Sequence, residues 1–293
     1  MNLTGMHTMR IGIGLPSHIA HVAGPLIVEW ARRAEQRGFA SVAAIDRLVY
    51  ESLDAIAALS VAAGATTDIG LMTNVLLAPL HPAVLLAKQI TTVAAASGDR
   101  LTLGLGVGSR PDDYTAVGVD FRRRGRILDQ TVALLRVACD AKVIAGDKAL
   151  SPAPARIPIL FGGRANATIR RAATIGDGWA AGALREYANQ SALADRVRAA
   201  WVEAGRPGRP RLHASVNFAL GDADAVAAGR ANLFRYYGFK PDYAALNVDD
   251  MVASPEDAAQ TVRAYRDLGF DGLVFHPFVA DIEQVDRLAD AVL

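Results

Sequence analysis

The sequence contains a single cysteine, Cys139, so no disulfide can form within the chain. Cys139 lies in the apolar helical pattern TVALLRVACD, which is typical of a buried and unreactive thiol. Because a disulfide framework is missing, the sequence favours a reducing compartment, and we expect a cytoplasmic protein.

An excess of charge is missing as well. The chain has 31 basic and 30 acidic side chains, a formal net charge of +1, which argues against nucleic acid or an anionic membrane as a partner. Apolar runs stay below the roughly 18 residues of a membrane span. The first ten residues, MNLTGMHTMR, lack the apolar core of a signal peptide. No His, Cys, Asp or Glu spacing predicts a metal site, and no Ser–His–Asp triad or carboxylate pair is apparent.

What the sequence has is a regular alternation over 293 residues, of which 52% are hydrophobic. Short apolar runs predict strands, and each is followed by a segment of helical periodicity. The eight expected strands lie at 9–16, 40–46, 69–77, 101–108, 159–163, 178–183, 212–220 and 271–278. Since no linker interrupts them, we predict an α/β fold, a (β/α)₈ TIM barrel, as a single domain over residues 1–293.

Two stretches exceed what eight strand–helix units need, 140–157 and 238–253. Barrel enzymes build their sites from loops at the carboxyl-terminal ends of the strands. We therefore expect both stretches to be insertions on that face and to determine the substrate.

Glycine occupies alternate positions in the fourth expected strand, LTLGLGVG. A dinucleotide fingerprint needs G-x-G-x-x-G after the first strand, so this spacing and this place do not fit one. Because alternate residues share a face, Gly104, Gly106 and Gly108 are expected to face the barrel interior. The glycines either make room for bulky neighbours or leave a bare floor for a flat ring.

Nearly the whole chain resembles the bacterial luciferase-like monooxygenases, a superfamily of flavin-dependent barrels. The stretches that carry the resemblance are AEQRGFASVAAIDRL, LMTNVLLAPLHPAVLLAKQITTVAAASGDRLTLGLGVG, DDYTAVGVDFRRRGRILD, PILFGGRANATIRRAATIGDGW and SPEDAAQTVRAYRDLGFDGLVFHP. The resemblance implies FMN or the deazaflavin coenzyme F-420 as cofactor. Our first expectation is an enzyme that uses reduced FMN and O₂ to oxygenate a small organic substrate.

Two alternatives to this activity stay open. One is a deazaflavin-dependent oxidoreductase that transfers hydride, and the other is a flavin-binding relative without catalysis. For the monooxygenase, reduced FMN would come from a separate flavin reductase or from reduction by NAD(P)H. A homodimer is also an open expectation.

The resemblance places the phosphate of the cofactor at FGGRANAT, where the fifth strand ends. Gly162 and Gly163 allow backbone amides to approach an anion, and the helix start offers unpaired N–H groups. Arg164 adds a charge and Thr168 a hydroxyl. The alternative is an ordinary glycine turn with Asn166 as a local cap.

Relatives often have a non-proline cis peptide at the end of the third strand. Here it would join Asn74 to Val75 and form a bulge behind the central ring. The alternative is a plain trans strand end. After the glycine strand, Ser109 and Asp112 are expected to reach the ring edge or the substrate.

The second strand ends in AIDRLVY, where many relatives have Asp-His and this chain has Asp46-Arg47. The departure argues against a sugar-phosphate dehydrogenase that depends on that histidine. Arg47 could hold an anionic substrate or a reduced-flavin anion, or it could pair with Asp46 to support the loop. Asp46, Arg47 and His276 are the candidate catalytic residues.

Other polar loop residues have less specific expectations. Arg110 and Asp113 are expected to form an ion pair on the surface. His18, with His21 beside it, could edge the substrate pocket, although exposed loop histidines are the simpler interpretation. His276, in VFHPF of the eighth strand, is expected either to line the pocket or to be a satisfied structural histidine.

Overall fold

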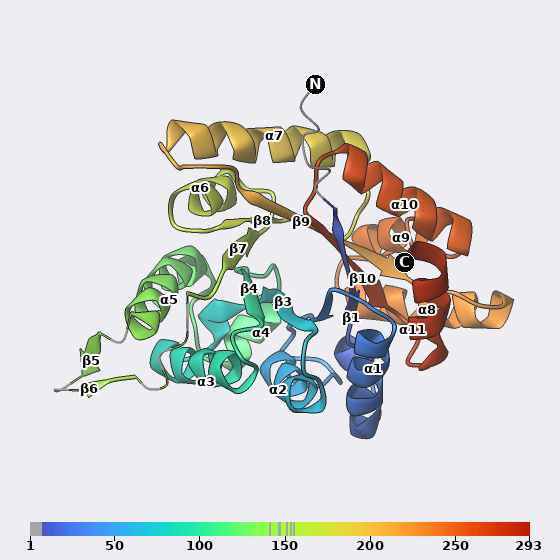
Figure 1. Ribbon diagram of the computed structural model, residues 1–293, viewed down its shortest axis with the longest axis horizontal. Helices are drawn as coiled ribbons and strands as arrows, with labels where there is room; N and C mark the ends of the chain where they lie inside the picture. Colours follow the sequence, from blue (N-terminus) through green and yellow to red (C-terminus); the bar gives the residue numbers. More distant parts are fainter. Residues whose placement is uncertain (1–7, 141, 146–147, 151, 153, 155) are drawn as a thin grey trace.

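In a computed structural model of the chain, eight parallel strands close into a barrel (Figure 1). The structure describes residues 8–140, 142–145, 148–150, 152, 154 and 156–293, so most of the stretch considered for a signal peptide lies outside it. The barrel strands are β1 (Arg10–Gly14), β2 (Ser41–Ala44), β3 (Gly70–Leu76), β4 (Leu101–Leu105), β7 (Ile159–Gly162), β8 (Gly178–Ala180), β9 (Arg211–Phe218) and β10 (Gly272–Pro277). Each overlaps one predicted run, and β10 closes on β1 with Gly272 opposite Arg10. The predicted (β/α)₈ barrel is confirmed.

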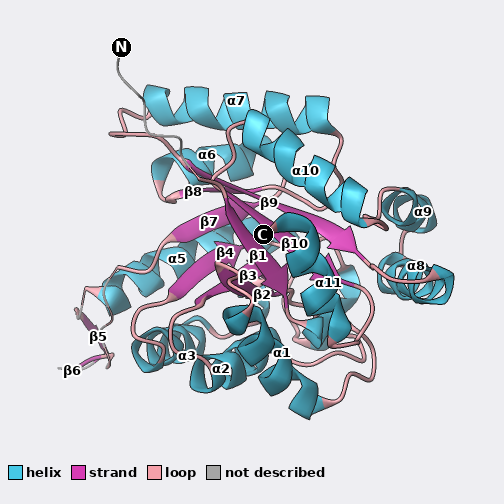
Figure 2. Cartoon of the chain, turned by 45° about the vertical axis from the view of Figure 1, so that its right-hand side comes forward, coloured by secondary structure: helices cyan, strands magenta, loops and turns pink. Residues whose placement is uncertain are grey.

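Helices surround the barrel as an outer layer (Figure 2). They are α1 (Gly24–Gln36), α2 (Ala55–Ala65), α3 (Ala83–Ala96), α5 (Arg124–Cys139), α6 (Asn166–Thr174), α7 (Tyr187–Glu203), α10 (Pro255–Asp267) and α11 (Glu283–Val292), with the short α4 (Pro111–Ala116) before α5. Polar caps start several of them: Asp54 accepts from Ala57 N at α2, and Ser254 accepts from Asp257 N at α10. In the described part of the chain, no helix has both the length and the apolarity that a membrane crossing requires.

Some inward positions of the barrel strands carry glycine, because their neighbours lie too close for a Cβ. A Cβ on Gly12 would lie 2.4 Å from Ser41 Oγ, and one on Gly14 would lie 2.4 Å from His276 Nδ1, so both glycines face inward. Halfway along the axis lies a layer of buried side chains that we call the barrel plug, with Val75 packed against it: Ala43, Met72, Leu160, Ala180 and Val274. The plug leaves one cavity at each end of the barrel.

The two predicted insertions lie at different ends of the barrel. Residues 238–253 belong to the carboxyl-terminal face, since β9 is followed by α8 (Ala223–Tyr237) and α9 (Pro241–Asp249) before α10. Residues 140–157, of which several lie outside the described residues, connect α5 to β7 instead. They carry the antiparallel pair β5 (Val143–Ala145) and β6 (Lys148–Ala149), apart from the barrel (Figure 1). Their expected place on the carboxyl-terminal face is wrong, because a segment that follows a helix starts at the amino-terminal end of the barrel.

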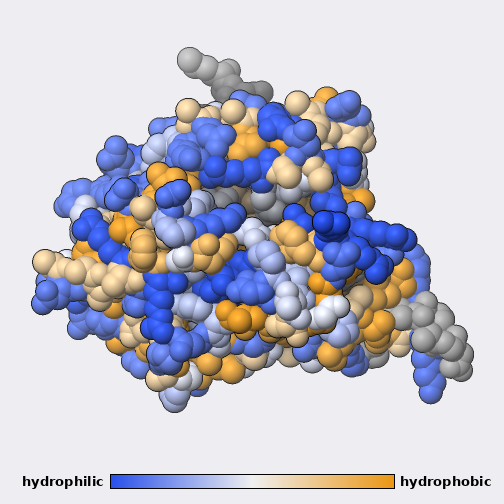
Figure 3. Space-filling view, turned by 180° about the vertical axis from the view of Figure 1, so that it is seen from behind, coloured by the Kyte–Doolittle hydropathy of each residue, from blue (hydrophilic) through white to orange (hydrophobic). Residues whose placement is uncertain are grey.

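The first and last helices meet where the ring of helices closes. Arg33 of α1 and Arg37, directly after that helix, both pair with Asp286 of α11, at 2.8 Å for Arg37 Nη1, and Arg37 also pairs with Asp290. Leu288 of α11 is fully buried in the main hydrophobic core. Elsewhere, the face shown in Figure 3 mixes hydrophilic and hydrophobic residues, in keeping with the balanced charge.

Candidate functional site

A cavity of about 450 Å³ opens at the carboxyl-terminal end of the barrel. Most of the residues predicted for the site line it: Asp46, Arg47, Asn74, Val75, Gly106, Gly108, Ser109, Gly162, Gly163, Arg164, Thr168 and His276. Asp112 and His18 lie outside this lining; Asp112 is on the surface and pairs with Arg110 at 2.8 Å.

The floor of the cavity is Val75, which follows the predicted cis peptide after Asn74. A Cβ on Gly106 would lie 2.7 Å from Val75 Cγ2, and one on Gly162 would lie 2.7 Å from Val75 Cγ1. A Cβ on Gly104 would lie 2.3 Å from the carbonyl oxygen of Thr73. These glycines therefore make room for β3 and its valine, as the first of the two alternatives predicted. Gly108, with a φ of 65° and Leu77 beside it, leaves the alternating pattern.

One side of the cavity is the loop between β7 and α6. Gly163 has a φ of 123°, which favours glycine, and its carbonyl accepts a 2.8 Å hydrogen bond from Trp179 Nε1. Asn166 does not cap α6, since its side chain accepts from Arg196. Thr168 N donates to the Ala165 carbonyl at 2.9 Å, so within the described residues the N–H groups of Asn166 and Ala167 are left to a ligand, with the Thr168 hydroxyl beside them. Arg164 pairs with Glu186 at 2.7 Å.

Asp46 is buried and connects the ends of two strands. Its Oδ2 accepts from Leu77 N at 2.9 Å and lies 3.4 Å from His81 Nε2. Arg47 turns away from Asp46, so the proposed pair between them does not form. Its Nη1 donates to the carbonyl of Tyr236 at 2.8 Å, and its guanidinium lies 3.8 Å from the centre of the Tyr50 ring. Burial, and then the charge of Arg110, lower the pKa of Arg47.

The expected surface pair of Arg110 and Asp113 is wrong in one respect: Asp113 is fully buried. Its Oδ1 accepts from Val49 N at 2.7 Å, while its Oδ2 lies 3.7 Å from Arg110 Nε. Arg110 stacks on Phe239 with 4.0 Å between the guanidinium carbon and the ring centre. Asp113 thus holds the loop that carries Arg47 against the start of α4.

Another side of the cavity is an aromatic wall, whose residues were not among those predicted for the site. Its members come from the end of α8, the connection after it and α9: Tyr236, Tyr237, Phe239 and Tyr243. Burial raises the pKa of Tyr236 and of Tyr237 well above the usual value, so both phenols stay neutral. A signal was present, because YYGFKPDY concentrates four aromatic residues in a chain with 6% aromatics.

Arg185 anchors the end of α9, one of the helices that carry the aromatic wall. It lies between β8 and α7, where its Nε donates to Asp250 Oδ1 at 3.0 Å and its Nη2 to the Asp250 carbonyl at 2.8 Å. Its Nη1 reaches Asp257 of α10 at 2.5 Å. One guanidinium therefore ties the end of α9 and the start of α10 to the barrel.

Two buried histidines lie near the cavity. His276 lines it, and within the described part of the chain neither ring nitrogen of His276 has a hydrogen-bond partner. Burial, and then His18, lower the pKa of His276 well below 6.5. His18 is buried rather than exposed, with its ring centre 5.9 Å from that of His276, and burial lowers its pKa to about 4. His21 is exposed, as the simpler interpretation predicted.

Acid–base and metal chemistry have few candidates here. The cavity lining contains one histidine, which is neutral near pH 7, and two carboxylates, Asp46 and Asp113, that accept backbone hydrogen bonds. Among the residues that the structure describes, no group of three His, Cys, Asp or Glu side chains could hold a metal ion. The lining is better suited to binding a flat ligand than to catalysing a reaction by itself.

Sequence comparison matches residues 9–272 to the luciferase-like monooxygenase family. An uncharacterized protein of Mycobacterium tuberculosis is 36% identical over 165 residues, which cover 53% of this chain and 57% of that protein. The match thus spans little more than half the length of the curated relatives.

Solved structures share the fold over nearly the whole chain. A coenzyme F-420-dependent secondary alcohol dehydrogenase superposes with a TM-score of 0.81, at 18% identity, over 97% of this chain and 98% of that one. A monooxygenase from Streptomyces bottropensis gives 0.79 at 18% identity, over 97% and 96%. The oxygenating component of a Pseudomonas putida diketocamphane monooxygenase, in complex with FMN, gives 0.69 at 14% identity, over 98% and 99%. At these identities the likeness shows a common barrel.

Proposed function

The chain belongs to the luciferase-like monooxygenase family, and on that premise we propose that it binds reduced FMN in the carboxyl-terminal cavity and oxygenates a small organic substrate with O₂. The observation that carries the proposal is the form of this cavity. A narrow aliphatic floor lies between a loop suited to an anion and a wall suited to an organic substrate.

The residues present fit a flat ring with a phosphate. Val75 offers a small apolar surface, and the glycines around it keep other side chains away from that surface. Gly163 and the start of α6 offer backbone N–H groups, and Thr168 a hydroxyl, at the end where the phosphate would lie. The volume, about 450 Å³, lies in the range of sites for small molecules and cofactors.

FMN, when bound, supplies the redox and oxygen chemistry of the reaction. The residues of this chain hold the ring, exclude water and place the substrate. Tyr236, Tyr237 and Phe239 cover the cavity with uncharged surface, which limits the access of water. His276 stays neutral near pH 7, so it can offer one N–H donor and one acceptor to the ligand without adding charge.

The cofactor can be tested directly. We expect the purified chain to bind FMN or its reduced form, measured by absorption spectrum, mass and fluorescence titration of the cofactor-free protein. The same titration with coenzyme F-420 is the comparison. Tighter binding of F-420 would contradict the FMN assignment and would support hydride transfer, the alternative chemistry.

The loop between β7 and α6, which we call the phosphate loop, gives a sharper test. In Gly163→Val the new Cβ would lie 3.2 Å from Thr168 Oγ1, in a backbone conformation that valine rarely adopts, so the loop must shift. We expect FMN affinity to fall at least about tenfold, or about 1.4 kcal/mol. Gly208→Val is the matched control, because Gly208 also has a positive φ of 67° but has no atom within 4 Å of its Cβ position. If both variants bind FMN like the parent, the loop is only a turn.

A further inference from the structure

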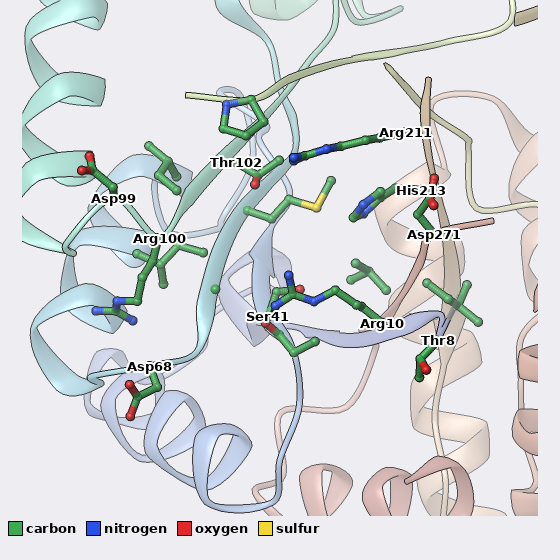
Figure 4. Close-up of a pocket in the computed structure, with 18 of the residues that line it drawn as sticks. Thr8, Arg10, Ser41, Asp68, Asp99, Arg100, Thr102, Arg211, His213 and Asp271 are labelled. Atoms are coloured by element: carbon green, nitrogen blue, oxygen red, sulfur yellow. Dashed lines mark hydrogen bonds between the residues drawn. The ribbon is translucent and has the colours of Figure 1, made fainter. Parts of the chain in front are cut away.

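A second cavity, of about 580 Å³, opens at the opposite, amino-terminal end of the barrel (Figure 4). Its lining includes the first inward residues of several strands, among them Arg10 of β1, Ser41 of β2, Thr102 of β4, and Arg211 and His213 of β9. None of these residues belongs to the site at the carboxyl-terminal end.

The strand pattern directs these side chains into the barrel. Arg10 shares a face with Gly12, whose Cβ would contact Ser41 Oγ. Arg211 shares a face with His213, and a Cβ on Gly272 would lie 2.7 Å from His213 Cε1. Figure 4 shows both guanidinium groups extended across the cavity with the His213 imidazole between them.

The two guanidinium groups are not neutralised by the described residues around them. Within this part of the chain, the side chain of Arg211 has no hydrogen bond or ion pair, and the side chain of Arg10 makes one long hydrogen bond, 3.4 Å, to the Ala40 carbonyl. Neighbouring arginines differ. Arg209 pairs with Asp271, and Arg100 donates to the Ile69 carbonyl at 2.7 Å and to other carbonyls.

The carboxylates at this cavity are turned away or already engaged. Those of Asp68 and Asp99 point away from its centre in Figure 4. Asp271 pairs with Arg209 and accepts a hydrogen bond from Leu212 N at 2.7 Å. Among the described residues, the exposed guanidinium groups of Arg10 and Arg211 therefore form a positive centre at the mouth of this cavity.

Uncharged donors surround this positive centre. The Nδ1 of His213 is buried and has no hydrogen-bond partner among the described residues. Burial lowers the pKa of His213 to about 4; Asp271 opposes that shift, and Arg211 and Arg10 add to it. The imidazole is thus neutral near pH 7 and can present one N–H. The hydroxyls of Ser41 and Thr102 lie on the same cavity lining.

We propose that this cavity is a second ligand site, which binds a small organic phosphate monoester. Two guanidinium groups, an imidazole and two hydroxyls provide more donors than the two oxygens of a carboxylate use, and they suit the three terminal oxygens of a phosphate. The cavity is much larger than a phosphate ion. Met72 and Val274 of the barrel plug line its inner end and provide an apolar surface for the organic part of the ligand.

The probes are phenyl phosphate and inorganic phosphate, measured by calorimetry with the full chain at low ionic strength. We expect phenyl phosphate to bind with one site at this end and more tightly than inorganic phosphate. The double variant Arg10→Gln with Arg211→Gln should lose at least about tenfold in affinity. Arg230→Gln, an exposed arginine of α8 at the other end of the molecule, removes one charge and should bind like the parent.

Gly163→Val separates this site from the phosphate loop of the flavin site. The affinity for phenyl phosphate should be unchanged in Gly163→Val and reduced in the arginine double variant, whichever cofactor binds in the carboxyl-terminal cavity. The reverse pattern, or no binding to the parent chain, would overturn the proposal. If the double variant does not fold, Thr102→Val is the substitute, since it removes one donor with little change in volume and should still weaken binding.

Discussion

The side chain of Val75 lies where β4 and β7 carry glycine. The missing Cβ atoms of these glycines leave room for Val75 to form the cavity floor. The inward direction of Gly104 and Gly106 follows from strand alternation, and the sequence predicted it. What lies opposite them does not follow from the sequence. Val75 belongs to another strand, whose register with β4 shifts between Thr73 and Leu76. The glycines therefore belong first to the packing of the barrel, and they act on a ligand through Val75.

This contact can be tested by a pair of substitutions. Gly106→Ala places a methyl group 2.7 Å from Val75 Cγ2, so we expect a loss of about 1–3 kcal/mol in the free energy of unfolding. Val75→Ala removes the opposing methyl groups, so the double variant should recover most of the loss caused by Gly106→Ala. Urea unfolding of the parent, both single variants and the double variant gives the coupling energy. Independent, additive effects would show that Val75 is not the reason for the glycine.

Among the elements, α8 and α9 form the part of the site that is built separately from the barrel. They supply the aromatic wall, and Arg185 ties the end of α9 to the start of α10 through Asp250 and Asp257. Periodicity predicted both the first of these helices and the extra chain after it. The contact between Arg47 and Tyr236 joins residues far apart in the sequence, so no local pattern could reveal it.

We expect Arg185→Met to loosen α9 while the barrel stays intact. The substitution leaves Asp250 Oδ1 and the Asp250 carbonyl without their guanidinium donors, and removing one partner from a half-buried charged network is costly. Hydrogen exchange of the amides in α9 should rise at least about tenfold, with little change in β1 or β10. Arg198→Met is the control, since Arg198 pairs with Asp195 on α7 and donates to the Leu268 carbonyl, away from α9. Equal exchange in α9 for both variants would mean that Arg185 is not the anchor.

At the scale of the whole molecule, the junction between α1 and α11 closes the ring of helices. Its ion pairs and its apolar contacts can be compared by how much each contributes to the free energy of unfolding. The ion pairs of Asp286 are partly exposed, so Asp286→Asn should cost at most about 1 kcal/mol. Leu288→Ala empties a fully buried position in the core and should cost about 2–5 kcal/mol. Denaturant unfolding measures both, and the idea that the apolar contact dominates fails if the two losses are equal.

The general plan of the molecule was readable from the sequence, because eight apolar runs alternated with eight or more helical patterns and strand ends converge on one face. That convergence is also why residues as far apart as Asp46, Gly163 and His276 could be assigned to one site. The placement of 140–157 failed although the order of elements contained the answer, since the stretch follows a helix. The amino-terminal cavity could not be foreseen, because it depends on how Arg10 and Arg211 extend across the barrel mouth.

The barrel plug also governs the order in which molecules come and go. Buried side chains from five strands close the interior, so a ligand in the carboxyl-terminal cavity has no passage through the barrel. It must leave by the mouth through which it entered. If FMN lies on Val75, at the inner end of that cavity, a substrate beside the aromatic wall lies between it and the mouth. Flavin must then bind before the substrate and dissociate after it. Steady-state kinetics should show compulsory-order binding, and bound substrate should prevent the release of flavin.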